Sequence, residues 1–302
     1  MSGATSAGSL VARRAAAVAV EVDRLFDALL AVPDDPRRRL YEAMRHATMG
    51  GGKRLRPLLV LAASELFNIS RDSALRVGVA VECIHVYSLV HDDLPAMDDD
   101  DLRRGKPTVH KAFDEATAIL AGDCLHDLAF EVLADEETHP APFVRIELVK
   151  ALAVASGTNG MAGGQMMDLV AENSEFDLQT VTRLQQLKTG ALLGAAVDMG
   201  AILAKVPYEA RTHLRGYARD IGLAFQIVDD LIDYEGDAAL AGKAVGKDAA
   251  AGKETFVSLL GPERARDQAR MLIEQAIQHL AQHGPEADVL RAVARYIVER
   301  NH

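Results

Sequence analysis

Only two of the 302 residues are cysteines, and both Cys83 and Cys124 lie in apolar segments. Two cysteines make no disulfide framework, so we interpret them as small buried side chains in a reducing cytoplasm. No run of about 18 uncharged apolar residues is present, so we expect no stable membrane insertion. No stretch alternates apolar and polar residues for long enough to indicate a sheet. The sequence therefore lacks the patterns of secreted, membrane-spanning and β-sheet proteins.

Basic residues are in the minority, since 33 Lys and Arg stand against 44 Asp and Glu and give a net charge of −11. Such a chain repels nucleic acid and anionic membranes at long range, so we expect no nucleic-acid partner. A polyanionic substrate would have to be bound by a local cluster of cations or through a metal ion.

Helical patterns dominate the chain. Residues 75–90, 191–203 and 221–232 are apolar nearly all round, as buried helices are, whereas two C-terminal segments are amphipathic. Pro and Gly interrupt the chain between such segments, but none of these breaks has the composition of a domain linker. We therefore predict an all-α fold, a single large bundle of about ten or more helices in one domain spanning residues 1–302.

The first twenty residues contain Arg13 and Arg14, several Ser and Ala, and no acid before Glu21, a composition that resembles a transit peptide. The apolar pattern, however, continues smoothly into residues 25–30. We therefore interpret residues 1–9 as a disordered tail that leads into a first amphipathic helix.

Two aspartate clusters each follow an apolar helical run, and they contain Asp92, Asp93 and 98–101 in the first and Asp229, Asp230 and Asp233 in the second. Carboxylates at the end of a buried helix are costly to desolvate unless a positive charge is near, and Mg²⁺ prefers carboxylate oxygens. On a regular helix Asp229 and Asp233 lie about 40° apart and share a face. Asp92 and Asp98 would lie about 240° apart, so the helix must break between them, and Pro95 supplies that break. A single acidic cluster is as often a solvated helix end, but two such clusters favour metal binding.

Cations are dispersed through the same regions, at Lys53, Arg54, Arg56, Arg103, Arg104, Lys188, Lys243, Lys247 and Lys253. Arg binds phosphate oxygens bidentately, and Lys binds them as a point charge. The Gly-Gly-Gly-Lys stretch lacks the Walker spacing, so a nucleotide P-loop is rejected. Together the cations and carboxylates predict a central cavity for two diphosphates, one bound through Mg²⁺ and one by side chains alone. The apolar helices would line a pocket for a hydrocarbon tail.

Two long motifs carry a family resemblance. Residues 88–108 read SLVHDDLPAMDDDDLRRGKPT, and residues 51–57 read GGKRLRP. With these motifs the chain resembles the trans-isoprenyl diphosphate synthases over nearly its whole length, most closely the bacterial farnesyl diphosphate synthases. The resemblance implies a prenyltransferase that joins isopentenyl diphosphate to dimethylallyl or geranyl diphosphate. It also implies three bound Mg²⁺ ions, a homodimer and a farnesyl diphosphate product.

The resemblance implies roles for single residues as well. The implied metal ligands are Asp92, Asp93, Asp98, Asp229 and Asp233. The implied cations for the allylic diphosphate are Arg103, Lys188, Lys243 and Lys253. The implied metal-free isopentenyl diphosphate site is Lys53, Arg56, His85 and Arg104. The implied dipoles facing the carbocation are Thr189, Gln226 and Gln165. Lys188, Thr189 and Gln226 are thus the expected catalytic residues, and the departed diphosphate is the expected proton acceptor.

Product length is expected to depend on the bulk just before the first motif, which forms the floor of the tail pocket in this family. Tyr87 stands five residues before Asp92, about 7.5 Å along a helix axis, and Ser88 follows it. A bulky ring there, with the longer spacing inside the first motif, resembles the bacterial fifteen-carbon type. The pair Lys247 and Asp248, in contrast, resembles the geranylgeranyl branch.

Three alternatives stay open. A geranylgeranyl diphosphate synthase would use the same mechanism. A class I terpene cyclase would not need the isopentenyl site, and its second metal motif usually mixes Asn, Ser and Glu. A non-catalytic regulatory subunit should have lost motif residues, and none is missing.

In an active enzyme, we expect the Gly-rich segment 236–252 and the tail at Arg300 to close over bound diphosphate.

Overall fold

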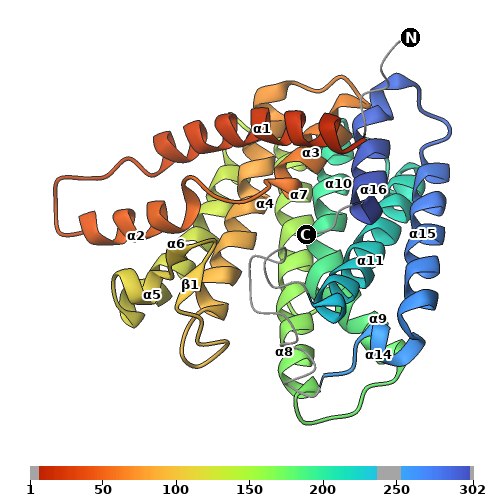
Figure 1. Ribbon diagram of the computed structural model, residues 1–302. Coiled ribbons are helices and arrows are strands. Elements are labelled where there is room, and N and C mark those ends of the chain that lie inside the picture. The colour runs from red at the N-terminus through yellow and green to blue at the C-terminus, as the bar shows by residue number, and fades with distance from the viewer. Residues whose placement is uncertain (1–6, 237–252, 300–302) are drawn as a thin grey trace.

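The computed structural model describes residues 7–236 and 253–299. The expected all-α fold is confirmed, because helices dominate these residues (Figure 1). The one sheet among them is an antiparallel hairpin of β1 (Leu102–Arg103) and β2 (Lys106–Pro107).

The α-helices are α1 (Ala7–Leu29), α2 (Arg38–Thr48), α3 (Leu55–Glu65), α4 (Arg71–Asp92), α5 (Val109–Ala112), α6 (Glu115–Ala134), α7 (Pro142–Ser156), α8 (Met161–Ala171), α9 (Leu178–Gln185), α10 (Ala191–Leu203), α11 (Thr212–Glu235), α14 (Phe256–Leu260), α15 (Pro262–His279) and α16 (Asp288–Glu299). A π-helical turn, η1 (Gln186–Gly190), joins α9 to α10. Two short 3₁₀ turns are η2 (Glu209–Arg211) and η3 (Pro285–Ala287).

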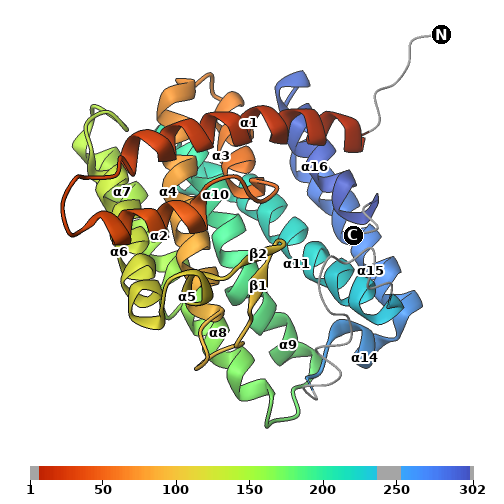
Figure 2. The same ribbon diagram turned by 60° about the vertical axis from the view of Figure 1, so that its left-hand side comes forward.

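Helix α1 is the expected first amphipathic helix, and it buries Val11, Val18, Val22 and Phe26. It crosses one end of the bundle above α3 and α4 in both views (Figures 1 and 2). The helix begins at Ala7, so the last three residues that the sequence analysis assigned to an N-terminal tail form its first turn.

The centre of the bundle is formed by α3, α4, α10 and α11, which pack on one another within one continuous core. Every residue of α4 from Val77 to Ile84 is buried, as its nearly all-round apolar sequence predicts. Small residues bring the central helices close together. A Cβ at Gly200 in α10 would lie 2.7 Å from the Ala63 Cβ in α3.

Helix α4 is the one helix in the described ranges that is long and apolar enough, by length and composition, to cross a membrane. In the folded chain 61% of its most apolar window is buried inside the bundle. A helix buried in a protein core can be as long and as apolar as a membrane span, and the burial of α4 is of this kind.

A buried ion pair ties the loop before α3 to the middle of α4. Arg54 Nη1 donates to Glu82 Oε1 at 2.9 Å, and the two side chains are 1% and 2% exposed. Arg54 Nη2 also donates to Asp23 Oδ1 of α1 at 2.8 Å. Removing one partner of such a pair leaves a buried charge without compensation. The pair therefore fixes the path of residues 50–54.

We predict that Glu82→Ala lowers the free energy of unfolding by about 3 kcal/mol, because the Arg54 guanidinium would stay buried without its main partner. Urea denaturation followed by circular dichroism measures this loss. Glu42→Ala is the matched control, since it breaks the exposed Arg38–Glu42 pair and should cost less than about 1 kcal/mol. Equal losses in the two variants would show that burial of the Arg54–Glu82 pair is unimportant.

Candidate active site

Helix α4 ends at Asp92, as the position of Pro95 predicts. The chain then turns back, and the Asp98 backbone N donates to the Asp92 carbonyl at 2.8 Å. Burial, together with the neighbouring charge of Asp98, raises the pKa of Asp92 to about 6 although the charge of Lys188 opposes the shift. A half-buried carboxylate with a second carboxylate beside it stabilises a bound cation, and its all-oxygen donor set suits Mg²⁺.

Asp93 and Arg103 are paired with each other. Arg103 Nε donates to the two carboxylate oxygens of Asp93 at 2.7 and 3.0 Å, and Asp93 is 3% exposed. The family resemblance implied Asp93 as a ligand of Mg²⁺ and Arg103 as a cation for the diphosphate, and no pattern in the sequence indicated this contact. The pair anchors the β1–β2 hairpin to the end of α4. Figure 2 shows this hairpin and α5 together on one flank of the bundle.

Lys188 and Thr189 lie in the π-helical turn η1. Such turns occur mostly as single-turn interruptions of α-helices, often at functional sites. Lys188 Nζ donates to Asp168 Oδ2 of α8 at 2.8 Å, and Lys253 Nζ donates to the same oxygen at 2.9 Å. Asp168 was missed by the sequence analysis, although it lies only three residues after Gln165 and is a lone acid in an apolar segment. Asp168 brings the two lysines together.

Gly164 of α8 allows the backbone of η1 to approach closely. A Cβ at this position would lie 2.2 Å from the Lys188 backbone N and 2.5 Å from its Cα. No side chain fits there without displacing η1. The Gly-Gly-Gln stretch therefore positions the backbone that carries Lys188 and Thr189.

The second aspartate cluster lies on α11, which packs against η1. Asp229 and Asp233 are half-buried, whereas Asp230 is buried and accepts a hydrogen bond from the Phe256 backbone N at 2.8 Å. One turn before Asp229, Gln226 Nε2 donates to Gln185 Oε1 at 2.8 Å. The hydrogen bond joins this part of α11 to the residue that precedes η1.

A cavity of about 300 Å³ lies between the last turns of α4, helix α8 and η1. The predicted site residues that line it are Arg56, His85, Tyr87, Ser88, Asp92, Gln165, Lys188 and Thr189. We call it the carboxylate-side cavity. Asp229, Asp233 and Gln226 are not among its lining residues and approach it from α11 through the contact with η1.

A second cavity, of about 770 Å³, lies beside α1 and the Gly-rich turn. All four residues predicted for the metal-free diphosphate line it, namely Lys53, Arg56, His85 and Arg104. We call it the cation-side cavity.

The cation-side cavity is electropositive. The Nε of Arg56 is buried and has no hydrogen-bond partner within residues 7–236 and 253–299. Burial, with the nearby charges of Arg56 and Arg104, holds the pKa of His85 well below its usual range, so the imidazole is neutral. This cavity favours an anion.

Gly52 gives Arg104 room at the edge of the cation-side cavity. A Cβ there would lie 2.5 to 2.8 Å from the guanidinium atoms of Arg104, and the φ of Gly52 is +87°. A side chain would be strained at that φ and would also displace Arg104.

The remaining predicted cations, Lys243 and Lys247, lie outside the described residues. So do Arg300 and the expected closure of segment 236–252.

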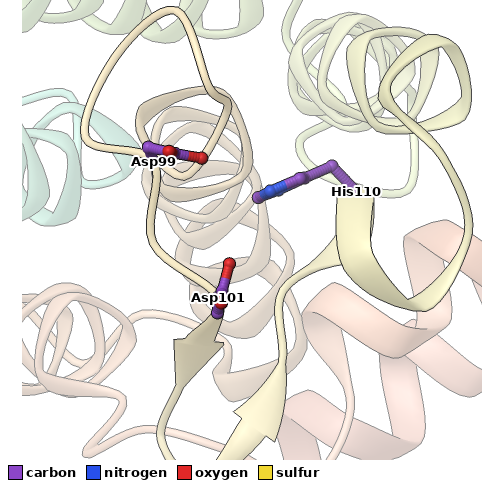
Figure 3. A group of neighbouring side chains, drawn as sticks. All are labelled: Asp99, Asp101 and His110. Carbon is purple, nitrogen blue, oxygen red and sulfur yellow. The ribbon is translucent and has the colours of Figure 1, made fainter.

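The later aspartates of the first cluster form a separate group. Asp99 and Asp101 gather with His110 of α5, and the possible ligand atoms of the three residues all lie within 4.8 Å of one another (Figure 3). His110 was not among the predicted site residues, because a lone histidine 18 residues after Asp92 has no spacing pattern of a metal site.

A helical bundle that places a cavity beside an aspartate cluster next to a cation-rich cavity has the architecture of isoprenoid diphosphate enzymes. The family model described as polyprenyl synthetase matches residues 37–296. The chain therefore belongs to the polyprenyl synthetase family.

Named relatives and a solved structure agree with this assignment. The chain is 48% identical to a farnesyl diphosphate synthase of Escherichia coli (strain K12) over 87% of this chain and 89% of that protein. It is 41% identical to a geranylgeranyl diphosphate synthase of Cyanophora paradoxa over 87% and 88%. The crystal structure of an FPP/GFPP synthase from Zymomonas mobilis is 60% identical, covers 95% of this chain and 98% of that one, and superposes with a TM-score of 0.88.

We predict that Gly164→Ala lowers kcat/KM for prenyl transfer by at least about 100-fold, because it displaces the backbone of Lys188 by an ångström or more. Gly194→Ala in α10 is the matched control, since a Cβ there meets nothing within 4 Å and should leave the activity unchanged. Steady-state kinetics and thermal unfolding of both variants separate a local displacement from a loss of folding. Full activity in Gly164→Ala would refute the positioning role.

Proposed function

We infer that the chain is a magnesium-dependent short-chain trans-prenyltransferase that makes farnesyl diphosphate from isopentenyl diphosphate and an allylic diphosphate. One observation carries this inference: Arg56 and His85 line both the carboxylate-side and the cation-side cavity. Two polyanionic substrates could therefore lie next to each other, one bound through metal ions and one by side chains. The farnesyl diphosphate synthase relatives support the same reaction.

The proposed metal ligands are Asp92, Asp98, Asp229 and Asp233, and we propose three Mg²⁺ ions as in the family. Bound Mg²⁺ supplies positive charge that stabilises the departing diphosphate. Asp93 would join these ligands when its pair with Arg103 opens, and Arg103 would then contact the allylic diphosphate.

The side chains of the carboxylate-side cavity have complementary roles. Lys188 lies close enough to Asp92 to affect its pKa, so it can donate to the diphosphate bound there. Ionisation of the allylic C–O bond would leave positive charge on carbon. The oxygen dipoles of Thr189 and Gln165 would face that charge from the cavity wall, and Gln226 would approach it from α11. Apolar wall residues such as Met161 exclude water that would otherwise capture the cation.

Isopentenyl diphosphate would lie in the cation-side cavity, bound by Lys53, Arg56 and Arg104. Because its imidazole is neutral, His85 would donate a hydrogen bond to this diphosphate without adding to the positive charge. Holding the double bond beside the allylic carbon makes attack effectively unimolecular. The new C–C bond forms, a proton leaves the adjacent carbon, and the released diphosphate is the proposed acceptor of that proton.

Incubation of the protein with labelled isopentenyl diphosphate, geranyl diphosphate and Mg²⁺, followed by product chromatography, tests this function. We expect a fifteen-carbon product that disappears when EDTA removes the metal. A mainly twenty-carbon product would favour the geranylgeranyl alternative. The absence of any product would favour the non-catalytic regulatory subunit and refute the proposal.

Tyr87 is the proposed floor of the tail pocket, with Ser88 beside it. The ring of Tyr87 lines the carboxylate-side cavity and packs edge-on against His91 and His126, with ring centroids 5.8 and 5.1 Å away. Ser88 Oγ donates to the His85 carbonyl at 2.9 Å, which keeps its small side chain against the helix. A growing chain that enters below Asp92 would therefore meet the Tyr87 ring.

We predict that Tyr87→Ala shifts the main product from fifteen to twenty or more carbons, because it removes the ring without touching a charged site residue. Product chromatography under saturating isopentenyl diphosphate measures the shift. Tyr208→Ala is the control, since Tyr208 is exposed and absent from both cavities. An unchanged product in Tyr87→Ala would rule out Tyr87 as the floor.

We also propose one polyprenyl synthetase domain, a cytoplasmic location and a homodimer formed through α6 and α7. These two helices pack together and expose five large apolar side chains, which are Ile119, Leu120, Phe143, Ile146 and Val154. The three on α7 fall within about 80° of one another around its axis. Exposed apolar groups concentrated on neighbouring helices favour an interface.

We predict that Ile146→Asp converts the dimer to a monomer, because it buries a charge without a partner in the interface. Light scattering coupled to gel filtration measures the mass in solution. Met271→Asp places the same charge on an exposed apolar position of α15 and should leave the dimer intact. A dimer that survives Ile146→Asp would place the interface elsewhere.

A further inference from the structure

Asp99, Asp101 and His110 converge from two segments of the chain. Asp99 and Asp101 lie in the connection between α4 and β1, and His110 lies in α5. Figure 3 shows the His110 ring pointing toward the two carboxylates. Their possible ligand atoms lie within 4.8 Å of one another. None of the three residues is among those proposed to hold the substrate Mg²⁺.

His110 is the residue that makes this group more than an acidic surface. Its side chain is in the interior, since the residue is 8% exposed, and its Nε2 has no hydrogen-bond partner among the residues that the structure describes. Its other nitrogen, Nδ1, lies 3.1 Å from Thr108 Oγ1. The Thr108 hydroxyl in turn donates to the Asp101 carbonyl at 3.4 Å.

These contacts are compatible with the tautomer that a metal ligand needs. With hydrogen on Nδ1, that nitrogen donates to Thr108 Oγ1, and the single hydroxyl hydrogen of Thr108 goes to the Asp101 carbonyl. Nε2 then carries a lone pair that is buried without a hydrogen-bond partner among the described residues. A buried polar atom without a partner is unfavourable, and a cation bound by Nε2 and the two carboxylates would satisfy it. A histidine whose second nitrogen is fixed by a hydrogen bond is the usual arrangement of a metal ligand.

We propose that Asp99, Asp101 and His110 bind a divalent metal ion of the first transition row, between Mn²⁺ and Zn²⁺ in the series. One imidazole with two carboxylates suits these metals, whereas Mg²⁺ selects oxygen donors alone. The site is therefore chemically distinct from the all-carboxylate site of the proposed reaction.

Lys111 is the competitor for this ion. Its Nζ contacts Asp101 Oδ1 at 2.8 Å, and both side chains are substantially exposed. Exposed ion pairs of this kind are weak, so a metal ion can displace the Lys111 ammonium from Asp101. Removing the Lys111 charge should therefore strengthen metal binding.

A bound ion would close the β1–β2 hairpin at its base. The Thr108 backbone N already donates to the Asp101 carbonyl at 3.0 Å, and the ion would add a second link across the same two strands. The hairpin carries Arg103 in β1 and Arg104 in the turn between β1 and β2, so the ion would fix the positions of both arginines. This consequence rests on the proposed function, but the binding of the ion does not.

The test is electron spin-echo spectroscopy of Mn²⁺ bound to the full-length protein without substrates. Imidazole coordination gives a ¹⁴N modulation that an all-carboxylate site cannot give. We expect the modulation in the unmodified protein and its loss in His110→Asn. A missing modulation in the unmodified protein, or one that persists in His110→Asn through another histidine, would overturn the proposal.

Two exposed variants keep the test decisive if His110→Asn fails to fold. Asp99→Asn should weaken Mn²⁺ binding about tenfold or more, and Lys111→Gln should strengthen it about two- to fivefold, as measured by titration. Unchanged affinities in both would indicate an adventitious ion and refute the site. Asp229→Asn is the control, because it alters the proposed substrate Mg²⁺ site and should leave the ¹⁴N modulation intact. A protein that shows the modulation but makes no prenyl product would refute the proposed function alone.

Discussion

A group of cations and a group of aspartates lie at the last turns of α4, and the rest of the site depends on holding both groups in place. On one side, Arg56 and Arg104 line a cavity beside a histidine that their charges help to keep neutral. On the other side, burial and Asp98 raise the pKa of Asp92. Each group of like charges is unfavourable when no ligand of opposite charge is bound beside it. A diphosphate on the first side and a metal–diphosphate complex on the second would compensate both, which is why the substrates complete the electrostatics of the protein.

Buried contacts around the two cavities hold these charged groups in place. The Arg54–Glu82 pair fixes the loop that carries Lys53 and Arg56. Gly164 permits the contact between α8 and η1, and Asp230 holds the start of α14. These supports are glycines and buried hydrogen bonds because charged groups need positions fixed to within a fraction of an ångström to act on a reacting bond.

Local patterns in the sequence predicted the helices and the orientation of the acids along them. Pro95 indicated the end of α4 near Asp92, and the helical period separated Asp229 and Asp233 from Asp230. The family motifs identified the cations of the second cavity. All of these predictions depend on residues close together in the chain.

Contacts between distant segments could not be predicted in this way. Asp168 binds Lys188 and Lys253, which lie 20 and 85 residues away in the sequence. The pairing of Arg103 with Asp93 depends on the path of the β1–β2 hairpin, and the π-helical form of η1 depends on its packing against α8. His110 becomes a candidate ligand only because the same hairpin returns it to Asp99 and Asp101. No period in the sequence encodes these distances.

The most direct test of the account is crystallography of the protein with Mn²⁺ and an unreactive thio analogue of geranyl diphosphate, with anomalous scattering used to locate the metal. The account predicts a cluster of Mn²⁺ ions on the diphosphate of the analogue, contacted by Asp92 from α4 and by Asp229 from α11. Metal peaks confined to one of the two aspartate clusters, or an analogue bound away from both, would contradict it.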